Sequence, residues 1–417
     1  MTHAPTDTST DSSTRVDQTA AAAGATPTRV SRGVALALLA LACGGFAIGT
    51  TEFVTMGLLP QVAAGTGVDI PTAGHYVSAY ALGVVVGAPL IAVLSARLPR
   101  KAILIGLMVG FAVFNIASGF ATDYGQLMVT RFLSGLPHGA FFGIGSVVAA
   151  GLVAKERRTW AVAMMLIGLS VANVIGVPLT TLLGQQLGWQ VPYWIVGVIG
   201  AVTVLAVAAW VPRQEGHGEG SMKGELRALG RLQVWLALLI GVVGFGGMFA
   251  TYSFITPTMT ELSGFSLSIV PVILGIYGLG MVAGTLTSGK VAYLGIMRGI
   301  IVLLAAIAVM LAAFGPAAHV PWLAIPFVFL LGYLPSILVP LLQTRLMDVA
   351  NDGQSLAAAL NHSTLNTANA LGAWLGSLVL AAGLGYEWPS RVGAILAVLG
   401  LGVALVSAAI GRRRPAL

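Results

Sequence analysis

The chain has 417 residues, of which 57% are hydrophobic and only 8% are charged, and its formal net charge is +7. Soluble domains carry about 45–50% apolar and about 25% charged residues, so this composition excludes a water-soluble globular protein. The expected solvent is a lipid bilayer. The basic excess then reports orientation in that bilayer, and no nucleic-acid partner is expected.

Twelve apolar stretches are long enough to cross a bilayer as helices, because about 20 residues span the hydrocarbon core. They lie at 34–59, 72–94, 102–121, 124–150, 159–185, 189–211, 233–258, 266–289, 299–317, 321–344, 353–382 and 391–411. We therefore predict an all-α integral membrane protein with twelve transmembrane helices. The only cysteine, Cys43, lies in the first stretch and can form no disulfide within the chain.

The loops between these stretches divide the basic residues unequally between the two sides. Of the 21 Lys and Arg residues, 19 fall on the side that holds both termini. The exceptions are Arg131 inside a stretch and Arg391 at the edge of the last one. The positive-inside rule then predicts cytoplasmic termini, with a disordered tail at 1–32 and a short tail at 412–417.

An internal repeat organises the stretches into two halves. The segment from Tyr80 to Gly87 (YALGVVVG) recurs from Tyr277 to Gly284 (YGLGMVAG), at an offset of 197 residues. The same offset relates three further landmarks, which are Gly49 and Gly246, Pro60 and Pro257, and Gly135 and Gly332. We predict two parallel six-helix halves, 33–211 and 233–411, joined by a cytoplasmic linker at 212–232. Halves of this kind place a binding site between them near the midplane.

Glu52 and Arg131 are the two formal charges inside the stretches, apart from Arg391 at an edge. Eight residues separate Glu52 from Pro60 and Arg131 from Asp123, so each charge lies roughly 12 Å from the same side. Charges inside a bilayer are costly and usually face a partner or a watery cavity. We expect the two side chains to meet, with Glu52 carrying a proton and Arg131 tuning its affinity. A permanent structural ion pair is the alternative.

His138 lies two helical turns beyond Arg131 on the same face, about 10 Å deeper. Histidine titrates near neutral pH, so His138 is a candidate proton or substrate ligand. The alternative is a histidine packed in the core, because Pro137 and Gly139 beside it indicate a bend made for packing.

The stretch 353–382 has the densest polar face of the second half. His362, Asn366 and Asn369 share one side through i, i+4, i+7 spacing. Buried amides need partners in hydrocarbon, so these side chains bind substrate or, alternatively, neighbouring helices. Asn173 in the fifth stretch is a similar candidate. Five aromatic residues are candidates to line a pocket, and the alternative is that they pack the core. They are Phe46, Phe53, Phe142, Tyr252 and Phe254.

The segment from Gly49 to Pro60 (GTTEFVTMGLLP) resembles the first-helix signature of a branch of the major facilitator superfamily. This branch comprises twelve-helix drug:proton antiporters of the arabinose-efflux-permease and chloramphenicol-resistance type, and the resemblance covers about residues 33–411. The R-x-x-x-G pattern from Arg131 to Gly135 resembles the family's helix-four motif, whose arginine is implicated in proton coupling. The resemblance therefore implies a proton-coupling role for Arg131.

Two further motifs resemble the family with departures. The loop from Ala92 to Lys101 (AVLSARLPRK) resembles the gate G-x-L-x-D-R-x-G-R-K, with Ala96 in place of the acid and Pro99 in place of the second glycine. The latch that this acid makes between the halves is therefore not expected here. The basic residues that remain are candidates for gating, and they are Arg97, Arg100 and Lys101. The alternative is that they only anchor the loop on the cytoplasmic side. Gly176 and Pro178 resemble the antiporter motif and indicate either a hinge or close helix packing.

No nucleophile, metal cluster or phosphate-binding loop interrupts the stretches, so we expect a secondary active transporter with no enzyme activity and no cofactor. The predicted function is proton-coupled efflux of small amphipathic compounds, such as chloramphenicol, from a bacterium, by a monomer in the plasma membrane. The alternatives are an exporter of sugars such as arabinose and a transport-dead membrane sensor or scaffold.

Overall fold

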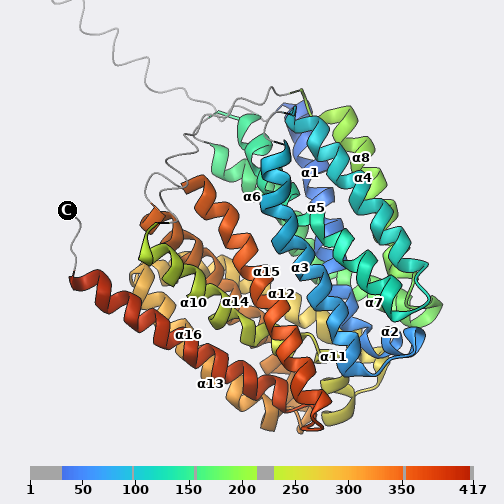
Figure 1. Cartoon of the computed structure of the whole chain (residues 1–417), viewed down its shortest axis with the longest axis vertical. Helices are drawn as coiled ribbons and strands as arrows, with labels where there is room; N and C mark the ends of the chain where they lie inside the picture. Colours follow the sequence, from blue (N-terminus) through green and yellow to red (C-terminus); the bar gives the residue numbers. More distant parts are fainter. Residues whose placement is uncertain (1–30, 96–97, 155–156, 214–229, 351–353, 414–417) are drawn as a thin grey trace, which may run out of the picture.

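In the computed structural model, the described residues are 31–95, 98–154, 157–213, 230–350 and 354–413, and they form helices and connecting loops (Figure 1). Most of the predicted tail 1–32, most of the linker 212–232 and the last residues of the tail 412–417 lie outside this part of the chain. We call the end of the molecule that holds the start of the first helix and the end of the last helix the terminal end. The opposite end is the distal end.

The first half forms six membrane-length segments. They are α1 (Arg32–Gly57) followed by α2 (Leu59–Thr66), α3 (Ile70–Ser95), α4 (Arg100–Gly119), α5 (Tyr124–Gly151), α6 (Arg158–Val171) with the π-helical turn η2 (Ala172–Gly176) and α7 (Val177–Leu187), and α8 (Val191–Trp210).

The second half repeats this arrangement. Its segments are α10 (Leu232–Tyr252) followed by α11 (Ile255–Pro257) and the π-helical turn η3 (Thr258–Leu262), η4 (Leu267–Ile269) leading into α12 (Val270–Ala292), α13 (Ile296–Ala317), α14 (Pro321–Ala350), α15 (Gln354–Ala381) and α16 (Trp388–Arg413). Within the described residues, eleven helices are long and apolar enough to cross a membrane. The polar-faced α15 occupies the place of the predicted stretch 353–382.

The sequence repeat corresponds to a repeat in packing. A Cβ atom added to Gly83 of α3 would lie 2.1 Å from the carbonyl oxygen of Phe132 of α5. At an offset of 197 residues, a Cβ added to Gly280 of α12 would lie 2.2 Å from the carbonyl oxygen of Phe329 of α14. Glycine is thus required at the same contact in both halves, because any side chain would overlap the backbone of the facing helix.

The first membrane segment breaks near the distal end, where a continuous helix to residue 59 was predicted. Helix α1 ends at Gly57, and α2 begins after Leu58, whose φ of −112° is not helical. Pro60 has no amide hydrogen, so the carbonyl oxygen of Met56 loses its intrahelical donor. The second half breaks in the same way just before Pro257.

The two halves are joined by hydrogen bonds in the distal part of the molecule. The Thr256 hydroxyl of α11 donates to the carbonyl oxygens of Met56 and Gly57, each at 3.0 Å. The Ser78 hydroxyl of α3 donates to the carbonyl oxygen of Ala370 of α15 at 3.1 Å. In Figure 1 the halves converge around α2, α7 and α11. The helices that carry the candidate site therefore meet where the halves are held together.

Candidate functional site

The guanidinium of Arg131 is fully buried in the first half, and its hydrogen bonds and ring contacts are made with neutral groups. Its Nη1 donates to Thr51 Oγ1 at 2.9 Å, and its Nη2 donates to the Thr51 carbonyl oxygen at 3.2 Å. The Thr51 hydroxyl in turn donates to Asn115 Oδ1 at 2.6 Å. The Arg131 Cζ atom lies 4.2 Å from the ring centroid of Tyr80 and 5.5 Å from that of Tyr193. These contacts stabilise the buried positive charge by hydrogen bonds and by cation–π attraction.

Glu52 follows Thr51 on α1 and is 7% exposed. It interacts electrostatically with Arg131, but no salt bridge joins these two described residues. The two side chains are therefore close but form no ion pair, so the alternative of a permanent ion pair is wrong for this structure, and the proton-coupling role of the two residues stays a prediction. Both Nη atoms of Arg131 donate to Thr51 instead, and its Nε has no hydrogen-bond partner. Glu52 is left as a buried carboxyl group close to the arginine but not bound to it.

The polar face of α15 reaches Glu52 from the other half. Asn369 is 1% exposed and lies within hydrogen-bonding reach of the Glu52 carboxyl group, yet neither of its amide atoms makes a hydrogen bond of good geometry. Asn366 donates to the carbonyl oxygen of His362 in its own helix at 3.1 Å, and its Oδ1 has no partner. These two amides therefore retain unused hydrogen-bonding capacity in a buried region.

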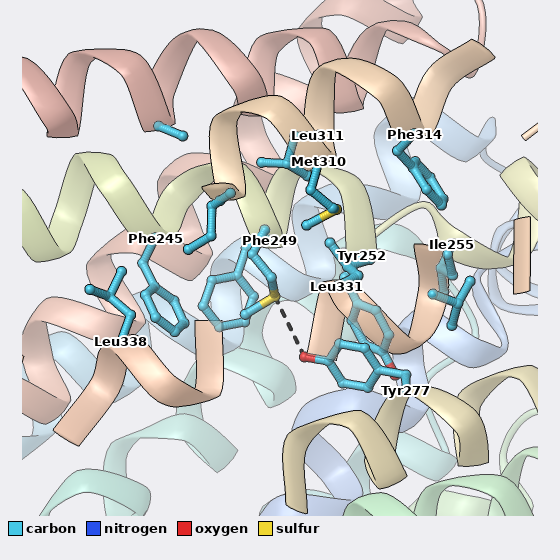
Figure 2. Packing of buried hydrophobic residues seen from close by; sticks show 14 of the residues in the cluster. Phe245, Phe249, Tyr252, Ile255, Tyr277, Met310, Leu311, Phe314, Leu331 and Leu338 are labelled. Carbon is cyan, nitrogen blue, oxygen red and sulfur yellow. Dashed lines mark hydrogen bonds between the residues drawn. The ribbon is translucent and has the colours of Figure 1, made fainter. Parts of the chain in front are cut away.

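Aromatic side chains from both halves meet beside Glu52. Phe53 of α1 packs edge-on against Tyr252 of α10, with ring centroids 5.7 Å apart, and lies 6.3 Å from Tyr277 of α12. The two tyrosines stack at 3.8 Å (Figure 2). The Tyr277 hydroxyl donates to Met248 Sδ at 3.5 Å, whereas the Tyr252 hydroxyl has no partner. Phe53 and Tyr252, both predicted to line a pocket, thus form one aromatic cluster between the halves.

His138 reaches the same tyrosine as Arg131, because its Nδ1 lies 3.2 Å from the Tyr80 hydroxyl. Its ring also packs edge-on against Phe142 at 5.4 Å. Phe142 stacks in parallel on His362 of α15, with centroids 5.8 Å apart. His138 and His362 thus approach each other from opposite halves through one phenyl ring. In the described part of the chain, no group of three or more His, Cys, Asp and Glu side chains could hold a metal ion.

Asn173 lies in the π-helical turn η2, which ends two residues before Pro178. Its Nδ2 donates to the carbonyl oxygen of Leu169 at 2.9 Å, and its Oδ1 is buried without a partner. The proline removes one backbone donor, and a widened turn is a common way for a helix to absorb that loss. A Cβ added to Gly176 would lie 2.5 Å from Thr50 Oγ1, so this glycine lets α1 approach closely. The hinge role of this turn stays a prediction.

The basic loop after α3 is only partly described. Arg97 and Ala96 lie outside the described residues, and Arg100 begins α4. Lys101 Nζ donates to the carbonyl oxygen of Ala208 at 2.7 Å, near the end of α8 in the same half. A cation at a helix C-terminus satisfies its last carbonyl groups. Lys101 therefore stabilises the first half, and the proposed gating role of this loop stays a prediction.

Sequence reasoning missed the groups that hold Arg131. Thr51 is adjacent to Glu52, and Asn115 is an isolated amide in an otherwise apolar stretch, which was a usable signal. Tyr80 was recognised only as the first residue of the repeat. Tyr193 carried no signal, because its contact with Arg131 depends on how α8 packs against the bundle.

In the described part of the chain, twelve membrane-length segments in two repeated halves, with one buried acid and one buried arginine near their interface, define a membrane transporter. The chain belongs to the Major Facilitator Superfamily, whose family model matches residues 41–359. It is therefore a multi-pass membrane transporter and not an enzyme.

Similar proteins agree with this assignment. The chain is 41% identical to the inner membrane transport protein YdhP of Escherichia coli K12, over 91% of this chain and 96% of that protein. It is 32% identical to a chloramphenicol resistance protein of Streptomyces lividans, over 85% and 91% of the two chains. A solved bacterial homologue of the human lysosomal transporter Spinster, inward-facing and unoccupied, has a TM-score of 0.65 at 15% identity, over 91% and 96% of the chains. This last likeness concerns the fold alone.

Proposed function

We propose that this transporter exports small amphipathic compounds in exchange for protons. The observation that carries the proposal is the Glu52 carboxyl group, which is buried at the interface between the halves and forms no salt bridge with any residue that the structure describes. A carboxylate locked in an ion pair keeps its charge, because the partner favours the charged form. A buried carboxyl group without such a partner can gain and lose a proton as its surroundings change. Arg131 then tunes Glu52 through space.

The proposed cycle uses the two ends of the molecule in turn. The distribution of basic residues favours cytoplasmic termini, and in the proposed cycle the distal end accordingly faces outwards and is closed in the present conformation. Glu52 takes up a proton when the distal end is open and releases it towards the cytoplasm. His138 extends the route from the Tyr80 hydroxyl towards α15. The proton gradient is the only energy source in this proposal, and no cofactor takes part. The proposed cellular location is the bacterial inner membrane.

The substrate class follows from the groups between the halves. The aromatic cluster of Phe53, Tyr252 and Tyr277 suits a flat apolar body, and the Tyr252 hydroxyl and the buried amides supply a few polar contacts. An unpartnered buried polar atom costs about 1–3 kcal/mol, which a substrate group or water would recover. A compound with one aromatic ring and a few hydroxyl or amide groups fits this set. The similarity to a chloramphenicol resistance protein makes a phenicol the first compound to test.

The test is uptake of labelled chloramphenicol into inverted membrane vesicles with an imposed inside-acid pH gradient. We expect accumulation that collapses with the gradient and falls at least about tenfold in Glu52→Gln. Glu261→Gln is the matched control, because Glu261 is exposed in η3 and outside the interface. Full gradient-driven transport by Glu52→Gln would contradict the proposal.

Labelled arabinose is tested in parallel, because sugar export is the competing substrate class. Accumulation of arabinose without chloramphenicol would identify a sugar exporter. A sensor or scaffold would move neither compound and would keep its cellular function in Glu52→Gln.

A further inference from the structure

The halves meet along α3 and α15 and also along α7 and α12, and these two contacts differ in how well they are packed. Between α3 and α15, a Cβ atom added to Gly74 would lie 2.4 Å from Ser377 Oγ. The Ser78 hydroxyl closes the same contact by its hydrogen bond to the carbonyl oxygen of Ala370. Between α7 and α12, the halves touch at two points and leave a groove between them.

The groove between α7 and α12 is bounded at each end by a contact between the halves. At its inner end, a Cβ added to Gly278 would lie 2.3 Å from the carbonyl oxygen of Asn173, so the two backbones are in direct contact. At its distal end, Gln185 Nε2 donates to the carbonyl oxygen of Leu267 at 2.9 Å. The groove between these two points has a volume of about 480 Å³.

The groove is apolar and opens towards the surrounding bilayer. Ten described residues line it, five from each half, and none of them has a polar side chain. Four of them are between 51% and 59% exposed, namely Ile175, Leu179, Val272 and Leu279. Pro178 lies nine residues before the end of α7 and Gly275 five residues after the start of α12, so the groove is roughly 7–14 Å from the distal ends of these helices. It therefore lies in the distal half of a hydrocarbon core that is about 30 Å thick.

The chemistry of the groove decides its occupant. Walls made of carbon atoms lose dispersion attraction unless something fills the space between them. An amphipathic substrate would leave its hydroxyl or amide groups without partners here, which is costly in hydrocarbon. A phospholipid acyl chain is narrow, flexible and wholly apolar, and the bilayer supplies it at this depth. We propose that an acyl chain of a phospholipid binds in this groove and favours the present arrangement of the halves, in which the distal end is closed.

The link to closure follows from the origin of the two walls. In the closed arrangement, a Cβ added to Gly275 of the second half would lie 3.6 Å from Pro178 Cγ of the first half. Movement of one half against the other changes this spacing, and with it the width of the groove. A ligand that fills the groove in one arrangement shifts the equilibrium towards that arrangement. The inference involves neither substrate nor protons, so it does not depend on the proposed function.

A second apolar groove provides the control. It lies between α13 and α16, has a volume of about 410 Å³ and is lined by apolar residues that include Ala312. Both of its walls belong to the second half, so a chain bound there does not respond to the arrangement of the halves. Gly275→Leu should fill the groove between the halves, and Ala312→Leu should fill the control groove.

The first measurement locates the bound chain. The protein is placed in nanodiscs of a phosphatidylcholine that carries a diazirine on one acyl chain, and illumination attaches this chain to the residues that it touches. Mass spectrometry of the peptides then maps the adducts. We expect adducts in both grooves of the parent protein. Gly275→Leu should lose those between α7 and α12 and keep those between α13 and α16, and Ala312→Leu should show the reverse.

The second measurement asks whether the bound chain holds the distal end closed. The reporter is Ser377→Cys in a Cys43→Ser background, because Ser377 is 1% exposed and is covered by α3. Its labelling by a water-soluble thiol reagent is compared between molecules with and without a lipid adduct, which differ in mass. In Ala312→Leu an adduct should slow labelling at least about fivefold, the lower end of typical coupling between two sites. In Gly275→Leu an adduct should have no effect.

Equal adduct yields between α7 and α12 in the parent and in Gly275→Leu, or adducts there that leave the labelling rate unchanged, would overturn the inference. Loss of these adducts in excess chloramphenicol would assign the groove to a substrate and would overturn it as well. If Gly275→Leu does not fold, Ile175→Trp replaces it, because a larger side chain at this 55% exposed position also fills the groove. Vesicle uptake tests the proposed function separately, so either can fail alone.

Discussion

Arg131 illustrates how a buried cation is stabilised by neutral partners, without a salt bridge to a described residue. Two hydrogen bonds to Thr51 and the face of Tyr80 surround a guanidinium with no exposed surface. A hydrogen bond to a charged group contributes about 1.5–3 kcal/mol, and a desolvated cation–π contact about 2 kcal/mol. This arrangement keeps the positive charge near Glu52 without a salt bridge between these two described side chains.

Thr51→Val should therefore destabilise the protein strongly, although valine has nearly the same shape as threonine. It removes the acceptor of Arg131 Nη1 and the donor to Asn115, so we expect a loss of about 2 kcal/mol or more. Thermal unfolding in detergent measures this loss of stability. Thr51→Ser keeps the hydroxyl group, so its melting temperature should stay close to that of the parent protein. Thr130→Val is the matched control, because the Thr130 hydroxyl only bonds its own helix. Equal melting temperatures for Thr51→Val and Thr130→Val would contradict this account.

At the scale of helices, the repeated glycines show why a sequence rich in this residue folds into rigid pairs. Gly83 and Gly280 each face a carbonyl oxygen of the neighbouring helix at a distance that admits no side chain. Helix interiors normally disfavour glycine by up to about 1 kcal/mol relative to alanine. Close packing of α3 on α5, and of α12 on α14, offsets this local cost.

Gly83→Ala and Gly280→Ala should each lower stability by about 1–3 kcal/mol, because the added methyl group forces the helices apart. The matched control is Gly106→Ala in α4, where an added Cβ meets nothing within 4 Å. That change should be neutral or stabilising, since alanine favours helix. Melting temperatures of the three variants test the account, and equal values would show that the repeat contact is not required.

At the scale of the whole molecule, the Thr256 hydroxyl joins the halves at the point where Pro60 interrupts the first segment. The proline leaves the carbonyl oxygen of Met56 without an intrahelical donor, and the other half supplies one at 3.0 Å. Separation of α11 from the end of α1 would break this hydrogen bond. The break in the helix and the closure of the transporter are therefore linked by the same carbonyl group.

Thr256→Val should weaken distal closure. The measurement is the rate at which a water-soluble thiol reagent labels a Ser377→Cys reporter, buried on α15, in a Cys43→Ser background. We expect this rate to rise between about twofold and tenfold, as for loss of a typical hydrogen bond. Thr256→Ser should restore the parent rate. Thr285→Val provides the control, because the Thr285 hydroxyl is exposed and bonds only Met281 of its own helix. An unchanged rate in Thr256→Val would show that closure does not depend on this contact.

Much of the fold could be predicted from the sequence, because apolar length and backbone satisfaction leave few solutions in a bilayer. The polar face of α15 and the isolated charges at Glu52 and Arg131 were also visible as exceptions to that rule. The break after Gly57 was not predicted, since a membrane helix often continues through a proline. Only the packing of the second half against this region showed how the free carbonyl group is satisfied.

The sequence by itself determined the class of protein, the repeat and the positions of the buried ionisable residues, because each depends on local composition and spacing along one chain. The tertiary structure decided which groups those residues bind. Thr51 rather than Glu52 holds Arg131, and Asn369 rather than an arginine approaches Glu52 from the other half. Helix periodicity fixes the depth and face of a side chain, but its partner depends on the rotation and separation of helices far apart in the chain.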